Sequence, residues 1–153
     1  MAQKSKKELI IACATPIFLD NGFKGTSIDM VVKQSGVSKP TVYNHFPDKA
    51  ALLLAVLQRW IEDNKPLIPP LKDFQALEAF VTTQWLSDDA IGFYALVIGE
   101  GRRFPLAKQL FWEQFDDLWR KALLYLMAQL PSTEQPANAL QLDQYLVLRL
   151  KQL

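Results

Sequence analysis

The chain has 153 residues, half of them hydrophobic, and its single cysteine and single histidine exclude a disulfide framework, a cysteine-rich zinc site and a histidine-pair metal site. No apolar run approaches the ~18 residues that span a bilayer, and the first seven residues lack the core of a signal peptide, so we expect a cytoplasmic protein with no membrane segment and no cofactor. The net charge of +1 is uneven: residues 1–60 carry eight Lys/Arg against four Asp/Glu, whereas residues 61–153 carry nine against twelve, so the basic first part is expected to meet a polyanion.

The first third of the chain predicts three short helices, because its apolar residues recur every three or four positions between glycine, serine and proline. The first helix covers residues 6–21 and ends at Gly22. The second lies between a cap at Thr26 or Ser27 and Gly36, and the third runs from Ser38 to Phe46.

Five further helices are predicted beyond Pro47, since no stretch alternates with the two-residue period of a strand. They cover Lys49–Asn64, Asp73–Leu86, Asp89–Arg103, Leu106–Leu130 and Asn138–Leu153. We therefore expect an all-α protein with two lobes, residues 1–50 and 51–153, bridged by the helix that begins at Lys49.

The second and third helices, joined by a tight turn at Gly36, have the layout of a helix-turn-helix, whose second helix enters the DNA major groove. At 100° per residue, Val42 and Phe46 share one face of this helix and are expected to be buried. Asn44 points the opposite way. The predicted base contacts are Lys39, Pro40, Thr41 and Asn44, because these side chains suit guanine acceptors, adenine and the thymine methyl group.

Residues beside that face are predicted to contact DNA phosphates. Tyr43 and His45 lie on the two flanks of the recognition helix, and Lys49 begins the next helix. Thr26 and Ser27 head the second helix, whose N-terminal amides attract anions.

The segment from Lys7 to Leu57 resembles the TetR family of bacterial transcriptional regulators. The matching runs are Phe18, Gly22-Phe23, Thr26-Ser27-Ile28, Gly36-Val37-Ser38-Lys39, Thr41-Val42-Tyr43-Asn44-His45-Phe46 and Lys49-Ala50-Ala51-Leu52. The resemblance implies that residues matching Lys39, Pro40, Thr41 and Asn44 face bases. It implies that residues matching Thr26, Ser38, Tyr43, His45 and Lys49 hold the DNA backbone.

Aromatic residues crowd the second lobe, and two interpretations of them stay open. They form either an ordinary helical core or a pocket for a small apolar or aromatic effector. The segment Val97–Pro105 resembles the AefR-like subset of TetR C-terminal domains, which carries a similar Arg-Arg-Phe-Pro run. The candidate pocket residues are Trp85, Phe93, Tyr94, Phe111, Trp112, Phe115 and Trp119.

The resemblance implies a ligand-responsive regulator, most simply a repressor, that binds a palindromic double-stranded operator as a homodimer on the bacterial nucleoid. The alternative is a constitutive DNA-binding protein whose shortened second lobe dimerises without sensing a ligand, since relatives are expected to continue about one helix further. An enzyme is not expected, because the sequence offers no nucleophile–base pair, metal cluster or phosphate loop.

Overall fold

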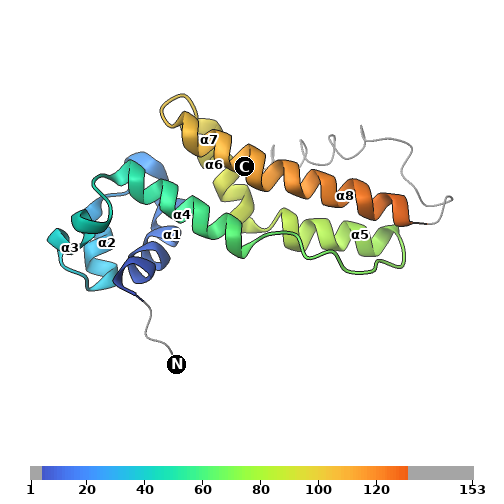
Figure 1. The fold of residues 1–153 in the computed structure, drawn as a ribbon, viewed down its shortest axis with the longest axis horizontal. Coiled ribbons are helices and arrows are strands. Elements are labelled where there is room, and N and C mark those ends of the chain that lie inside the picture. Colours follow the sequence, from blue (N-terminus) through green and yellow to red (C-terminus); the bar gives the residue numbers. More distant parts are fainter. Residues whose placement is uncertain (1–4, 131–153) are drawn as a thin grey trace.

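The computed structural model describes residues 5–130, and every regular element in that range is helical, so the expected all-α fold is confirmed. The N-terminal lobe holds α1 (Lys6–Gly25), α2 (Ile28–Ser35) and α3 (Lys39–His45), and α4 (Lys49–Asp63) runs from it toward the second lobe (Figure 1). The second lobe holds α5 (Phe74–Phe80), the π-helical turn η1 (Val81–Trp85), α6 (Asp88–Glu100), α7 (Pro105–Phe111), the π-helical turn η2 (Trp112–Asp116) and α8 (Asp117–Gln129).

Short polar side chains begin the helices of the N-terminal lobe. Ser5 and Glu8 form a reciprocal capping box, in which Glu8 Oε2 accepts from the Ser5 amide at 2.9 Å and Ser5 Oγ accepts from the Glu8 amide at 3.2 Å. Ser27 caps α2 by accepting from the Met30 amide, and Asp48 caps α4 by accepting from the Ala51 amide, without the return bond of a capping box. Of the two caps predicted for the second helix, Ser27 is therefore the one used.

Gly22 breaks α1 near its end. Its backbone angles, φ 65° and ψ −176°, lie in a region that only glycine adopts readily, and the last turn of α1 follows this kink. The predicted end of the first helix at Gly22 thus marks the break, although helical geometry resumes up to Gly25.

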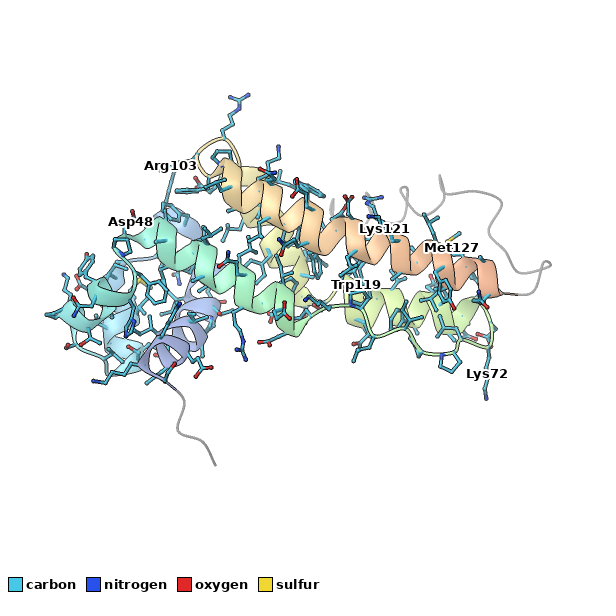
Figure 2. All side chains as sticks on the ribbon, viewed as in Figure 1. Asp48, Lys72, Arg103, Trp119, Lys121 and Met127 are labelled. Atoms are coloured by element: carbon cyan, nitrogen blue, oxygen red, sulfur yellow. The ribbon has the colours of Figure 1, made fainter. Side chains whose placement is uncertain are left out.

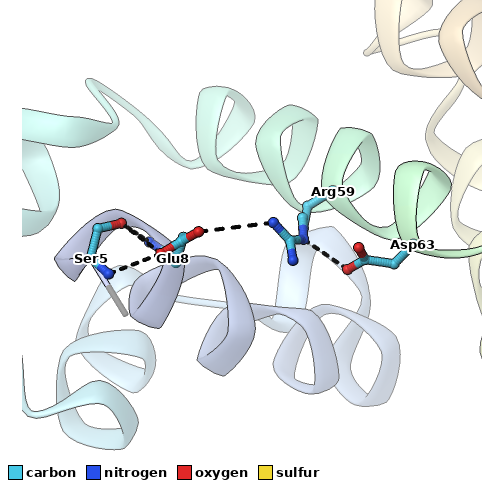
Figure 3. Close-up of polar contacts among 4 residues, drawn as sticks. All are labelled: Ser5, Glu8, Arg59 and Asp63. Atoms are coloured by element: carbon cyan, nitrogen blue, oxygen red, sulfur yellow. Dashed lines mark hydrogen bonds and ion pairs between the residues drawn. The ribbon is translucent and has the colours of Figure 1, made fainter. Parts of the chain in front are cut away.

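One hydrophobic core joins the two lobes, since α4 packs on α1 and α7 while α1 also packs on α6. A Cβ added at Gly92 would lie 2.9 Å from Leu19 Cδ2, so glycine lets α6 approach α1 closely. On the surface, Arg59 of α4 donates to Asp63 at 2.7 Å and reaches Glu8 of α1 at 4.0 Å (Figure 3).

The second lobe departs from the predicted α-helices at two places. The helix predicted over 106–130 is continuous in the structure, but its residues 112–116 form the π-helical turn η2 between α7 and α8. The helix predicted over 73–86 is likewise continuous, with α5 followed by the π-helical turn η1. A π-helical turn accommodates an extra residue, and no local sequence signal announces it. The predicted helix at 138–153 lies outside the described residues. Within residues 5–130, no helix combines the length and apolarity needed to cross a bilayer.

Candidate nucleic-acid interface

Helix α3 presents the two faces that the sequence predicts. Val42 is fully buried and Phe46 is 3 % exposed, whereas Pro40 and Asn44 are exposed. Contacts with α1 and α2 anchor the buried face, and Gly36 turns the chain between α2 and α3 with a positive φ of 66°. A rigid helix thereby carries a hydrogen-bonding surface away from the core, as base recognition requires.

Lys39, the first residue of α3, pairs with Asp29 in the first turn of α2. Its Nζ lies 2.8 Å from Asp29 Oδ1, and both side chains are solvent-exposed. The hydrogen bond that Lys39 donates to Asp29, assisted by the charge of that carboxylate, raises the pKa of the Lys39 amine above its ordinary value. Lys39, a predicted base contact, is therefore already paired with Asp29 in the absence of DNA. The sequence did not predict this ion pair.

The remaining predicted contacts of α3 lie on or beside its outer face. Ser38 Oγ and Thr41 Oγ1 are hydrogen-bonded at 2.8 Å, which links the N-cap to the first turn. Tyr43 is 44 % exposed, and the His45 side chain is exposed at the last turn. Ser27 is exposed at the start of α2.

Two predicted phosphate contacts have other partners. Thr26 is 2 % exposed, and its hydroxyl donates to the Gly22 carbonyl at 2.7 Å, so the expected surface contact of this side chain is not supported. Lys49 Nζ donates to the carbonyls of Phe23 and Thr26 at 2.6 and 2.7 Å, which leaves one N–H for any phosphate. Both residues therefore fasten the last turn of α1 to α4.

Phe23 stands at a joint between the lobes. Its ring centroid lies 4.2 Å from that of Phe104, at the corner where α6 turns into α7, and Lys49 Nζ lies 4.3 Å from the Phe23 centroid. Next to this joint, a hollow of ≈ 310 Å³ is lined by residues that include Asp48 and Arg103, both labelled in Figure 2. The α6–α7 corner thus touches the lobe that carries α3.

The aromatic residues of the second lobe pack directly against one another. The Trp60 ring centroid lies 4.7 Å from that of Phe93 and 4.8 Å from that of Phe115, and Trp85 stacks on Trp119 at 6.1 Å. Six of the seven candidate pocket residues are buried, and the seventh, Trp112, is partly buried against them.

A polar chain crosses this aromatic core. Trp85 Nε1 donates to Tyr94 Oη at 3.1 Å, Tyr94 donates to Asp116 Oδ1 at 2.5 Å, and Arg120 Nε donates to Asp116 Oδ2 at 2.7 Å. Asp116 is 4 % exposed. Each π-helical turn ends in a member of the chain: η1 in Trp85 and η2 in Asp116.

Burial, followed by the negative charge of Asp116, holds the pKa of Tyr94 far above its ordinary value, so Tyr94 stays a hydrogen-bond donor. Sequence reasoning missed Asp116 and Arg120. Their four-residue spacing is a signal, but it fits an exposed ion pair such as Arg59–Asp63 equally well.

Comparison with known proteins gives the same assignment as the geometry of α2 and α3. A family model described as bacterial regulatory proteins, tetR family, matches residues 10–56, a range that includes every predicted DNA contact. The transcriptional regulator RutR of Escherichia coli strain K12 is 31% identical over 110 residues, which cover 72% of this chain and 48% of RutR. The chain belongs to the TetR family.

A second curated transcriptional regulator matches over a shorter range. The transcriptional activator FasR of Mycolicibacterium smegmatis is 43% identical over 56 residues, 37% of this chain and 25% of FasR. The chain spans about half the length of RutR and a quarter of FasR, judged by the 48% and 25% covered.

Two solved structures share the fold. A crystal structure assigned to the TetR family, from Mesorhizobium loti MAFF303099, superposes with a TM-score of 0.60 at 24% identity, covering 80% of this chain and 64% of that one. The flavonoid-responsive regulator FrrA superposes with a TM-score of 0.56 at 31% identity, covering 81% and 65%. The helical second lobe is therefore a TetR-like arrangement as well.

Proposed function

We propose that this protein is a transcriptional regulator that binds double-stranded operator DNA through α3. The supporting observation is the division of α3 into a buried face, with Val42 and Phe46, and an exposed face that carries Asn44. An asparagine side chain can donate to and accept from one adenine edge in the major groove. Lys39, Pro40 and Thr41 complete the proposed base contacts, and Ser27, Ser38, Tyr43 and His45 are the proposed phosphate contacts.

The protein acts as a homodimer in this proposal, because two recognition helices about 34 Å apart would enter successive major grooves of a palindrome. A bacterial cytoplasm, with the protein on the nucleoid, is the matching location. We further propose repression as its effect on transcription. Mapping whether the bound site overlaps a promoter, and measuring transcription with and without the protein, distinguishes repression from activation.

We also propose that the protein responds to a small-molecule ligand. The described aromatic core of the second lobe offers an apolar or aromatic effector the chemistry it needs, and differential binding to two conformations would lower DNA affinity. Direct ring contacts, such as Trp60 with Phe93, favour the second candidate, a constitutive DNA-binding protein that only dimerises. Thermal melting across a library of aromatic compounds separates the two, since only a sensor gains stability from a ligand.

The test of DNA binding is a salt-dependent gel shift on DNA flanking the protein's own gene, combined with a mass measurement in solution. We expect a dimer, with Asn44→Ala binding the flanking DNA about 10-fold or more weakly while binding to a scrambled duplex is unchanged. Tyr43→Phe should weaken binding to both duplexes alike. The exposed α4 residue Gln58 provides a control, Gln58→Ala, that should bind as wild type.

Equal losses on both duplexes for Asn44→Ala would remove Asn44 from the base contacts. A wild-type protein that binds neither duplex at low salt would refute the proposed function.

A further inference from the structure

We propose that Asp29 is a specificity-determining residue that cancels the long-range attraction of Lys39 for DNA phosphates while leaving its hydrogen bonds available to bases. The inference rests on the proposed DNA-binding function and goes beyond it, because Asp29 is not itself a proposed DNA contact. It begins from the ion pair across the turn between α2 and α3, with Lys39 Nζ 2.8 Å from Asp29 Oδ1.

The position of Lys39 is unfavourable for its own helix. The N-terminus of a helix carries partial positive charge, so a cation in the first turn of α3 is repelled, whereas Asp29 in the first turn of α2 is attracted. Asp29 thus neutralises the positive charge of Lys39, which does not stabilise α3. The helix dipole of α3 therefore does not favour a lysine at this position, whereas recognition of a base acceptor does.

The pair is open to competition, because 51% of the Lys39 side chain and 73% of the Asp29 side chain are exposed. Solvent screens an exposed pair and makes it weak. A DNA group that offers a good hydrogen-bond acceptor can therefore share or replace Asp29 as the partner of the Lys39 ammonium, which has three donors.

Phosphates and bases respond differently to such a pair. Attraction to the phosphate backbone acts over a long range and requires net charge, and the pair has none, so Lys39 adds little to binding of random DNA. A hydrogen bond to guanine O6 or N7 is short and directional, and the ammonium can still donate it. Asp29 therefore raises the ratio of specific to non-specific affinity.

The test compares wild type with Asp29→Asn, which removes the charge and keeps the shape and an acceptor oxygen. Two 30-bp duplexes serve as probes: one selected from a random pool by the wild-type protein, and one scrambled. We expect Asp29→Asn to bind the scrambled duplex about threefold to tenfold tighter between 50 and 200 mM salt, with a salt slope steeper by roughly 0.9 per recognition helix. Affinity for the selected duplex should rise less, so the specificity ratio falls.

Three controls isolate the pair. Glu62→Gln makes the same charge change and breaks the Glu62–Lys65 pair (2.6 Å) at the far end of α4 (Figure 1), and should leave the ratio unchanged. Asp29→Glu keeps the charge and should restore wild-type discrimination. In a Lys39→Met background, Asp29→Asn should tighten binding to both duplexes alike and leave the specificity ratio unchanged, because the net charge changes but no lysine is released.

An Asp29→Asn protein with wild-type affinity for the scrambled duplex would overturn the inference while the proposed function stands. So would a fall in the specificity ratio of equal size in the Lys39→Met background, since the discrimination would then not depend on Lys39. A wild-type protein that binds neither duplex at 50 mM salt would overturn both proposals together.

Discussion

In the N-terminal lobe, three short polar side chains act locally: Ser5, Ser27 and Asp48 each cap the helix that follows. In the second lobe, polar side chains meet across the core: Tyr94 of α6 contacts Asp116, 22 residues away. The first arrangement leaves charged and amide groups at the surface, where DNA can reach them. In the second arrangement, the polar groups hydrogen-bond to one another inside the core.

The difference matters because the two arrangements respond differently to substitution. A cap is partly replaced by water when it is removed, whereas a buried donor or acceptor that loses its partner bears its full desolvation cost. Matched changes in the two lobes should therefore have unequal effects on the free energy of unfolding, although the chemistry of each change is the same.

Tyr94→Phe should have the largest effect. Without the hydroxyl, Trp85 Nε1 loses its acceptor and Asp116 Oδ1 loses its donor, and at ~1–3 kcal/mol for each buried group we expect a destabilisation of about 2–4 kcal/mol. Urea unfolding followed by tryptophan fluorescence measures it. Tyr125→Phe is the control, since Tyr125 of α8 is 55% exposed and should tolerate the change.

Equal stability of the Tyr94→Phe and Tyr125→Phe proteins would show that the polar chain adds nothing to the fold.

Glycine-to-alanine changes in the two lobes should have opposite signs. Gly22→Ala forces a side chain into the conformation at φ 65° and ψ −176°, which costs about 1–3 kcal/mol although nothing lies within 4 Å of the new Cβ. Gly99→Ala also meets open space, but Gly99 lies in helix α6, where alanine stabilises by about 0.5–1 kcal/mol. Thermal melting of both proteins measures the signs, and a shared sign would contradict the kink at Gly22.

The features that the sequence predicts are those that neighbouring residues decide. Helix starts at serine or aspartate, the turn at Gly36 and the buried positions of Val42 and Phe46 follow from caps and periodicity, and the structure has them. The family model matches this same part of the chain, residues 10–56.

The features that sequence reasoning missed depend on how distant segments meet. Lys49 looked like a surface cation, yet its ammonium donates to the carbonyls of Phe23, in the last turn of α1, and of Thr26, the residue that follows α1. Asp29 and Lys39 are ten positions apart and pair only because α2 and α3 cross. The two π-helical turns present the same difficulty, because their last residues, Trp85 and Asp116, both contact Tyr94 of another helix.

Alkaline pH should weaken the second lobe through Tyr94. The raised pKa means that folded Tyr94 stays protonated while an unfolded tyrosine ionises near pH 10, so the stability it contributes is complete below pH 10 and is lost as the pH rises further. The gap between wild type and Tyr94→Phe should shrink by up to ~1.4 kcal/mol per pH unit above 10. Urea unfolding at pH 8, 10 and 11 measures it, and a constant gap would contradict the burial of Tyr94.

The smallest effects come from two arginines that each pair with an aspartate one helical turn away, Arg59 with the aspartate after it and Arg120 with the aspartate before it. Arg59 and Arg120 each donate Nε to an aspartate four residues away at 2.7 Å, but the Asp63 side chain is 53% exposed and the Asp116 side chain only 6%. Arg120→Gln should cost about 1 kcal/mol or more at any salt concentration, because it takes a donor from a buried carboxylate. Arg59→Gln should cost less, and its cost should vanish in 1 M salt. Equal, salt-sensitive losses would mean that water reaches Asp116, which would remove the distinction between the exposed pair on α4 and the core pair of the second lobe.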